Sequence, residues 1–213
     1  MDSISQREEM VRVQLAGRGI RDRRVLEAMR MVPRHEFVPE IFRGEAYGDH
    51  PLPIGEGQTI SQPYIVAAML AHLALQSSDR VLEVGTGSGY VTALLSLLSA
   101  EAYSVERHAQ LAALAESTLY RLRYRNVKIR VGDGGQGWAE YAPFDAILVS
   151  AATAEMPPAL FEQLREGGRM MLPVGPPSSQ ELQLILKICG QAEVSVLEGC
   201  RFVPLVEGAV DSG

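Results

Sequence analysis

Residues 81–90 have the sequence Val-Leu-Glu-Val-Gly-Thr-Gly-Ser-Gly-Tyr, which puts a glycine-rich turn directly after a short apolar segment. The apolar segment predicts a buried strand over residues 80–84, and the apolar residues that follow predict a helix over residues 90–98. A strand, a tight turn and a helix in succession are typical of parallel α/β sheets. This segment constrains the fold more than any other part of the chain.

The rest of the chain after residue 64 continues the alternation of strands and helices. We expect strands over residues 102–106, 127–131, 144–149, 169–174, 182–188 and 194–202, and helices over residues 65–75, 108–125 and 158–164, the last ended by Gly167-Gly168. Alternation of this kind predicts an α/β, doubly wound and mostly parallel sheet that is covered on both faces, a Rossmann-like fold. The 213 residues, 46% of them hydrophobic, suit one large unit.

The first 63 residues have a different character. Helices are expected over residues 5–16 and from Asp22, whose carboxylate can cap the helix, to a point before Pro33. Residues 33–63 are rich in proline and glycine, and a long stretch of that kind is usually a lid or a binding loop. We therefore expect an N-terminal helical extension and active-site lid over residues 1–63, and one compact α/β unit over residues 64–213.

Composition excludes several classes of protein. The net charge is −6, whereas proteins that grip nucleic acid usually show a basic face, so we expect no nucleic-acid partner. No apolar stretch approaches the ~18 residues of a membrane span, and the first residues are polar, which favours a cytoplasmic protein without a membrane partner. Cys189 and Cys200 lack metal-ligand spacing and are expected to be small buried thiols, and no metal site is expected.

The glycine turn predicts a nucleoside-type ligand. Ligands of open α/β sheets bind beyond the carboxyl ends of the strands, where the strand order reverses, and the glycines of the turn allow close approach to the backbone. The spacing is G-x-G-x-G, whereas dinucleotide-binding proteins have G-x-G-x-x-G, and Tyr90 occupies the position of their third glycine. Glu83, inside the strand, can neutralise an ammonium group but would repel a pyrophosphate, and Glu106 can accept both ribose hydroxyls. Together these features favour S-adenosylmethionine over a dinucleotide.

Asp133 follows the third strand of the alternating region, between Gly132 and Gly134. Its carboxylate can meet the exocyclic amine of adenine, or it can bond its own backbone in a tight turn. Its expected place at the same sheet edge as Glu83 and Glu106 favours the adenine contact. The predicted cofactor site thus also includes the turn and its flanks: Gly85, Thr86, Gly87, Ser88, Gly89 and Gly134.

The chain resembles the protein-L-isoaspartate O-methyltransferase family over residues 32–205. The resemblance rests on segments 32–38 (VPRHEFV), 51–63 (PLPIGEGQTISQP), 132–138 (GDGGQGW), 172–175 (LPVG) and 201–205 (RFVPL). It implies a protein-repair enzyme that methylates isoaspartyl residues in damaged proteins, a sheet with its last strands reordered, an active-site serine at Ser61 and a cofactor contact at Thr59. The segment Ala152-Thr-Ala154 departs from relatives that carry proline or alanine beside the transfer pocket.

The residues are compatible with this chemistry. The acceptor would be the free α-carboxylate of an L-isoaspartyl residue, with a D-aspartyl residue as the second candidate substrate. With a pKa of about 3.5 the α-carboxylate is ionised at neutral pH and needs no general base. Ser61 would position it by a hydrogen bond, although Ser61 also precedes Pro63 and a helix and so suits a helix cap. Joining an anionic carboxylate to a cationic sulfonium is favoured in a dry pocket, which the lid would provide.

Alternatives remain at this point. A peptide backbone can pair with an exposed edge near residues 202–204, or that segment can be a terminal strand that packs the core. The expected partners are isoaspartyl-containing peptides and proteins, and the expected state is a monomer. A methyltransferase acting on a small carboxylate or amine, a non-catalytic binding module and a dehydrogenase are the competing interpretations.

Overall fold

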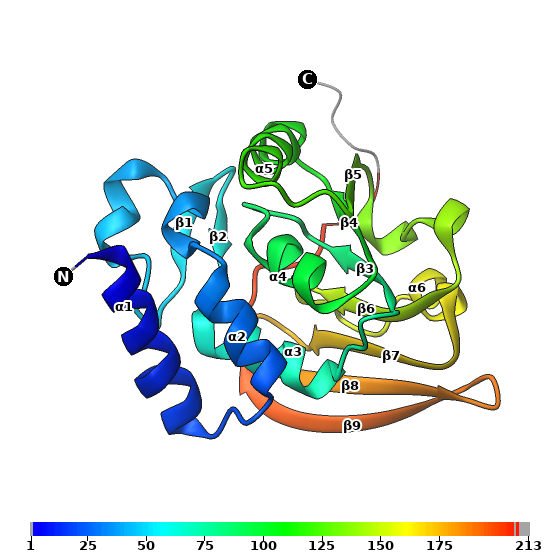
Figure 1. The fold of residues 1–213 in the computed structure, drawn as a ribbon. Coiled ribbons are helices and arrows are strands. Elements are labelled where there is room, and N and C mark those ends of the chain that lie inside the picture. Colours follow the sequence, from blue (N-terminus) through cyan, green and yellow to red (C-terminus); the bar gives the residue numbers. More distant parts are fainter. Residues whose placement is uncertain (1, 207, 209–213) are drawn as a thin grey trace.

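The centre of the molecule is one seven-stranded sheet with the order β5-β4-β3-β6-β7-β8-β9 (Figure 1). Strands β3 to β7 run parallel to one another, whereas β8 is antiparallel to β7 and β9 is antiparallel to β8. The strands are β3 (Arg80–Val84), β4 (Glu101–Glu106), β5 (Val127–Val131), β6 (Phe144–Val149), β7 (Leu164–Val174), β8 (Gln180–Ile188) and β9 (Gln191–Cys200). The predicted mostly parallel, Rossmann-like sheet is therefore confirmed. The computed structural model describes residues 2–206 and 208.

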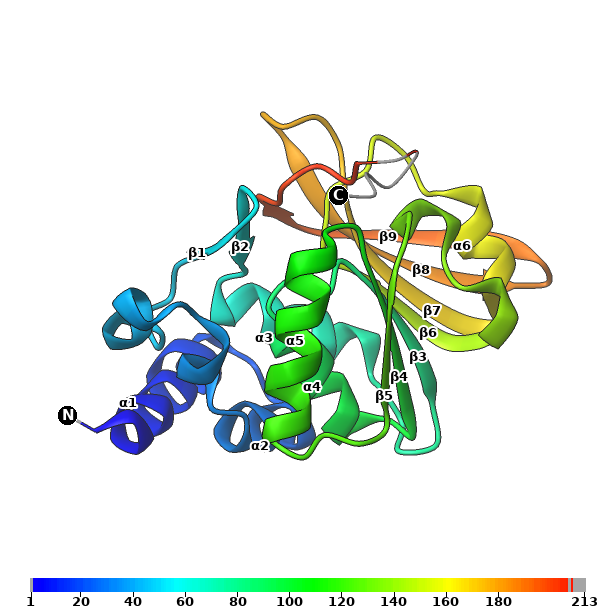
Figure 2. The ribbon, with the colours of Figure 1, turned by 90° about the horizontal axis from the view of Figure 1, so that it is seen from above.

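Helices cover the two faces of the sheet, and each face has its own apolar core (Figure 2). One face carries α3 (Pro63–Leu73), α4 (Tyr90–Leu98) and α5 (Ala109–Arg121); the other carries α6 (Pro158–Gln163) and the short 3-10 turns η5 (Gly134–Gln136) and η6 (Ala139–Tyr141). Along β3, Val81 packs into the first core, whereas Leu82 and Val84 pack into the second. Both faces of β3 are therefore buried, which explains its unbroken apolar sequence.

The N-terminal region folds against α3 and α4. It consists of α1 (Ser3–Glu9), which continues through a π-helical turn η1 (Met10–Leu15) and a 3-10 turn η2 (Ala16–Arg18), and then α2 (Arg23–Met31). Asp22 caps α2 by accepting hydrogen bonds from the amides of Arg24 and Val25. Val32 is extended, as expected before a proline. Met10, Val11 and Leu15 are fully buried in the same core as α3 and α4.

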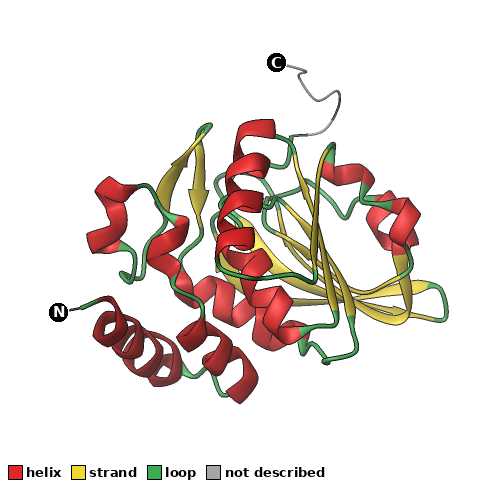
Figure 3. Ribbon diagram, turned by 45° about the horizontal axis from the view of Figure 1, so that its top comes forward, coloured by secondary structure: helices red, strands yellow, loops and turns green. Residues whose placement is uncertain are grey.

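Residues 33–63 contain more regular structure than their proline and glycine content suggests. Two 3-10 turns, η3 (Arg34–Phe37) and η4 (Glu40–Glu45), precede an antiparallel hairpin of β1 (Leu52–Gly55) and β2 (Gln58–Ile60). Figure 3 shows this hairpin apart from the main sheet. Its turn residues Glu56 and Gly57 have φ of +51° and +68°. Strands of three and four residues interrupted by Pro53 are too short to leave a periodic pattern.

Three sequence-based expectations about local structure are wrong. Gly167 and Gly168 do not end a helix, because α6 stops at Gln163 and both glycines lie inside β7, next to an irregularity in its pairing with β6. Cys189 is exposed in the turn between β8 and β9, and Cys200 is half-buried. Residues 202–204 follow β9 and are not part of a terminal strand. Residues 207 and 209–213, which belong to the expected compact unit, lie outside the described residues.

The described residues contain neither a membrane-spanning helix nor a cluster of metal ligands. None of the helices in residues 2–206 has the length and apolar content that crossing a membrane requires. Within the same residues, no group of three histidine, cysteine or acidic side chains has the arrangement of a metal site.

The cap of α2 gives a direct test of the N-terminal packing. Replacing Asp22 by alanine leaves the amides of Arg24 and Val25 without their acceptor, and we expect the free energy of unfolding to fall by about 1 kcal/mol. Asp22→Ser keeps a capping oxygen and should lose less than about 0.5 kcal/mol. Urea denaturation of both variants measures the difference, and equal losses would show that the cap is not the cause.

Candidate functional site

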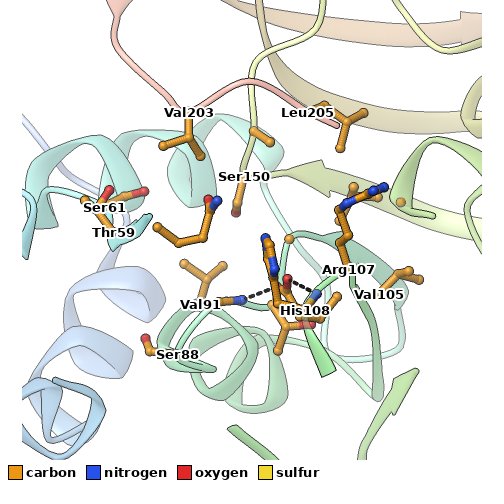
Figure 4. Close-up of a pocket in the computed structure, with 18 of the residues that line it drawn as sticks. Thr59, Ser61, Ser88, Val91, Val105, Arg107, His108, Ser150, Val203 and Leu205 are labelled. Carbon is orange, nitrogen blue, oxygen red and sulfur yellow. Dashed lines mark hydrogen bonds between the residues drawn. The ribbon is translucent and has the colours of Figure 1, made fainter. Parts of the chain in front are cut away.

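A cavity opens at the carboxyl ends of β3 and β4, beside the point where the strand order reverses between β3 and β6. Its empty volume is about 770 Å³, which includes open solvent. The walls come from five parts of the chain, together with Gly134: residues 58–61, residues 84–88 with 90–91, and residues 105–108, 150–151 and 203–206. We call this space the first cavity (Figure 4).

The glycine turn forms one wall of the first cavity. Gly85, Gly87 and Gly89 have φ of +92°, +53° and +85°, a conformation that side chains with a Cβ rarely adopt. Gly85, Thr86, Gly87 and Ser88 line the cavity. Gly89 does not; it precedes α4 and lies against Ala115 of α5, where a Cβ would come within 3.1 Å. Four of the five predicted turn residues thus face the cavity, and the fifth packs the turn onto a helix.

Glu106 holds the turn in place. Its Oε2 accepts a hydrogen bond of 2.7 Å from the amide of Gly87, and its Oε1 accepts one of 2.9 Å from the amide of His108. The carboxylate is almost fully buried, yet it lines the cavity. A carboxylate offers about four acceptor positions, so two remain for hydroxyl groups of a ligand. This remaining capacity fits a ribose, as predicted for S-adenosylmethionine.

Glu83 lies beneath the turn and does not line the cavity. Its Oε2 accepts hydrogen bonds from the hydroxyls of Thr92 (2.5 Å) and Ser104 (2.7 Å), while Oε1 has no partner among the described residues. Complete burial raises the pKa of Glu83 to about 8, and the nearby charge of Glu106 acts in the same direction. Ser104 also bonds the hydroxyl of Thr86 at 2.6 Å. The contacts of Glu83 therefore reach the turn through Ser104, not through the cavity.

The carboxylate of Asp133 accepts hydrogen bonds from backbone amides in a tight turn, which is the alternative to a contact with adenine. Its Oδ1 accepts from the amide of Gly135 and its Oδ2 from the amide of Gly208, each at 2.9 Å, so that it caps η5. Gly134, not Asp133, lines the cavity. A Cβ on Gly134 would collide with Val84, so the close approach of η5 to the end of β3 requires glycine.

A second cavity adjoins the first, with an empty volume of about 1720 Å³ that includes open solvent. Its lining comes mainly from residues 59–65, 177–180 and 199–203. The residues that line both cavities are Thr59, Ser61, Ser150 and Val203. Figure 4 shows Thr59 and Ser61 on one side of the first cavity and the side chain of Ser150 pointing into it.

Ser61 is not a helix cap. The N-cap position of α3 is Gln62, and the amide of Tyr64 donates a hydrogen bond of 3.0 Å to Asp49. Within the part of the chain that the structure describes, the hydroxyl of Ser61 has no hydrogen-bond partner. The hydroxyl is therefore available to a ligand at the junction of the two cavities.

Ser150 is a site residue that sequence reasoning missed. Its amide donates a hydrogen bond of 2.8 Å to the carbonyl of Val84, which fixes it beside the glycine turn. Its hydroxyl, like that of Ser61, has no partner in the described residues. The available signal was its position, because Ser150 is the first residue after β6, the strand next to β3 at the reversal of strand order.

The segment after β9 closes the wall between the cavities. Ala152 donates to the carbonyl of Val203 at 2.8 Å and accepts from the amide of Leu205 at 2.7 Å. Thr153 donates to the carbonyl of Pro173 at 3.0 Å. The Ala152-Thr-Ala154 segment thus acts mainly through its backbone, which joins the ends of β6 and β7 to residues 203–205.

Comparisons with known proteins agree with this geometry. Residues 5–210 match the profile of the family described as protein-L-isoaspartate(D-aspartate) O-methyltransferase. The chain belongs to this family. A protein-L-isoaspartate O-methyltransferase of Koribacter versatilis is 54% identical over 94% of this chain and 90% of its own length. One of Syntrophobacter fumaroxidans is 53% identical over 94% of each chain.

Solved structures of this family have the same fold. A protein-L-isoaspartate O-methyltransferase matches with a TM-score of 0.85 and 30% identity over 96% of this chain and 67% of its own. A putative Plasmodium falciparum member, solved in complex with S-adenosyl-L-homocysteine, matches with a TM-score of 0.83 and 29% identity over 98% of this chain and 100% of its own. The expected family, fold class and activity class, an S-adenosylmethionine-dependent protein O-methyltransferase, are confirmed.

The buried carboxyl of Glu83 makes stability depend on pH. Its pKa is about 8 in the folded protein and 4.5 as the ordinary value, so the folded state holds a proton that the unfolded state releases between these values. The stability due to this proton is fully present below pH 4.5 and is lost as the pH rises through about 8. Glu83→Gln keeps a neutral group of similar shape and should not lose stability over this interval.

We therefore expect the difference in unfolding free energy between Glu83→Gln and the unmodified protein to grow in favour of the variant from pH 4.5 to pH 8. Urea denaturation across this interval measures it. Glu116→Gln, an exposed change on α5, is the matched control. A difference that stays constant with pH would contradict a buried, protonated Glu83.

Proposed function

We propose that the chain methylates the free α-carboxylate of L-isoaspartyl residues, and also the free side-chain carboxylate of D-aspartyl residues, in damaged proteins, with S-adenosylmethionine as the donor and a methyl ester as the product. The observation that carries this proposal is the pair of unpartnered hydroxyls, Ser61 and Ser150, on the wall shared by two adjoining cavities. One cavity has the features of a nucleoside site, and the other, with an empty volume of about 1720 Å³ that includes open solvent, leaves room for a polypeptide substrate.

The first cavity is the donor site. When bound there, S-adenosylmethionine supplies a methyl group on a positively charged sulfur. Glu106 would accept hydrogen bonds from its ribose hydroxyls, and the turn at residues 85–88 would give the backbone room for close contact. Thr59 and Gly134 complete the wall. Three further residues of the proposed site act by holding its backbone in place. Glu83 and Gly89 support the glycine turn, and Asp133 positions Gly134.

The second cavity is the acceptor site. An isoaspartyl α-carboxylate is ionised at neutral pH, so its oxygen carries the lone pair that forms the new bond and no general base is needed. The hydroxyls of Ser61 and Ser150 would donate hydrogen bonds to the carboxylate and hold one oxygen toward the donor site. The alignment of the two reactants matters, because holding them in line lowers the activation free energy by roughly 7–11 kcal/mol relative to reactants that meet by diffusion.

The hairpin β1–β2 would act as the lid. The carboxylate of Glu56, at its turn, lies 3.8 Å from the ring of His108, which lines the opposite side of the first cavity. Ile54 of β1 lies against the glycine turn, 3.2 Å from where a Cβ of Gly87 would be. A hairpin that spans the cavity in this way would exclude water, and a charged donor and acceptor react faster without water to stabilise them separately.

We further propose that the protein is a cytoplasmic monomer that binds neither membranes nor nucleic acid. A net charge of −6 opposes binding to phosphate backbones and anionic lipids. Two unpaired cysteines suit a reducing compartment.

Substitution of the two serines tests the acceptor site. Ser61→Ala and Ser150→Ala each remove one hydrogen bond to a charged group, worth roughly 1.5–3 kcal/mol, so kcat/KM for an isoaspartyl peptide should fall roughly 10- to 100-fold. Affinity for S-adenosylhomocysteine should change far less. Base-labile methyl ester formation from a labelled donor measures turnover, and calorimetry measures affinity.

The same peptide with a normal aspartyl residue is the control for the substrate, and Ser61→Thr and Ser150→Thr are the controls for the hydroxyl. Absence of a base-labile ester on the isoaspartyl peptide would refute the proposed activity. Equal losses of turnover and cofactor affinity would place the serines in the donor site alone.

Limited proteolysis tests the lid. Saturating S-adenosylhomocysteine should protect residues 44–63 from cleavage, because a filled first cavity gives the hairpin a surface to close on. Glu56→Gln weakens the contact with His108 and should reduce this protection, whereas Glu40→Gln, on an exposed 3-10 turn away from the cavity lining, should not. Cleavage at one rate with and without the ligand would count against a lid.

A further inference from the structure

The second cavity carries an unusual charge for a protein of net charge −6. Of the described residues that line it, Arg201 alone is charged; the others are apolar or neutral polar side chains. Arg201 is exposed, and no hydrogen bond or ion pair joins its guanidinium to any residue in the part of the chain that the structure describes. A cation without an internal partner at the rim of a substrate cavity is available to a substrate.

The backbone around Arg201 is fixed on both sides. On one side, Cys200 is paired with Gln180 at the end of the β8–β9 ladder. On the other side, the buried side chain of Gln180 makes two hydrogen bonds to Phe202: its Nε2 donates to the carbonyl at 3.1 Å, and its Oε1 accepts from the amide at 2.6 Å. One glutamine therefore holds the residues before and after Arg201, which fixes the backbone of Arg201 at the rim of the second cavity.

Two carboxylates near this segment lie outside the cavity lining. Burial raises the pKa of the Cys200 thiol to about 11, and the negative charges of Glu198 and Glu181 act in the same direction. Neither glutamate makes an ion pair with Arg201, and neither lines the cavity. A substrate in the cavity therefore meets the positive charge at shorter range than the two negative ones.

We propose that Arg201 makes the acceptor site selective for isoaspartyl residues that have acidic side chains close by in the substrate's sequence. This inference rests on the proposed methylation of isoaspartyl residues and adds a choice of substrate to it. A preference for acidic flanking residues is informative, because a net charge of −6 acting at long range would favour basic substrates. Only a local positive charge reverses that preference, and the attraction is largest within a few ångströms.

The test uses three peptides that share an isoaspartyl residue and differ only at the flanking positions, which carry glutamate, glutamine or lysine. We expect kcat/KM at low salt to be roughly fivefold to tenfold higher for the glutamate peptide than for the lysine peptide. Arg201→Ala should abolish this ratio, Arg201→Glu should invert it, and Arg201→Lys should keep most of it. At about 1 M salt, where charges beyond about 3 Å are screened, the ratio should shrink.

Arg23→Ala is the matched control. Arg23 is an exposed arginine on α2 that makes no hydrogen bond or ion pair within the described residues and lies outside both cavities. It changes net charge by the same amount and should leave the peptide ratio unaltered. A preference of the unmodified protein for the lysine peptide, or a ratio unchanged by Arg201→Ala, would overturn the role of Arg201. Methyl esters formed on all three peptides at one rate would contradict this inference alone, whereas no ester on any peptide would contradict the proposed activity itself.

Discussion

Three hydrogen bonds at the carboxyl end of β3 determine where the glycine turn, Glu106 and Ser150 lie around the first cavity. The amide of Gly85 donates to the carbonyl of Val105, the amide of Ser150 donates to the carbonyl of Val84, and the amide of Gly87 donates to the carboxylate of Glu106. These bonds join the end of the central strand to both of its neighbours. As a result the turn, Glu106 and the hydroxyl of Ser150 occupy fixed positions around one cavity, and a ligand that binds there need not order them itself.

The acceptor side is built differently, from segments far apart in the chain. Ser61 follows a hairpin that is not part of the main sheet, whereas Val203 follows the last strand. Local backbone contacts hold these segments: Asp49 binds the start of α3, Ala152 binds residues 203 and 205, and Gln180 binds Phe202. The first cavity thus depends on the sheet, while the second cavity depends on loops that the sheet brings together.

This difference explains how much the sequence could predict. The strands around the glycine turn have buried faces and strong apolar patterns, so their extents, the fold and the turn residues followed from the sequence. The residues after Ser61 are those of a helix start, so the local sequence suits a cap at Ser61. The group that accepts the hydrogen bond from the amide of Tyr64 is instead Asp49, which lies 15 residues away in the chain. Ser150 carried no motif at all. Its role depends on strand order, which a local pattern does not contain.

Other differences have the same origin. Gly167 and Gly168 suggested the end of a helix, but they lie within β7 between Leu164 and Arg169, both of which pair with β6, so the strand continues past two residues of weak strand preference. The acidic residues Glu83 and Asp133 were correctly placed at the sheet edge, but whether each faces the cavity depends on side-chain packing. The hydroxyls of Thr92 and Ser104 donate to Glu83. The amides of Gly135 and Gly208 donate to Asp133.

The wall common to both cavities has a consequence for ligands. The residues that line both cavities are Thr59, Ser61, Ser150 and Val203. A compound that joins a nucleoside to a peptide carboxylate would lie across this wall and use both cavities at the translational cost of one molecule. The geometry also couples evolution of the two sites, since any replacement in the wall alters the fit of both partners at once.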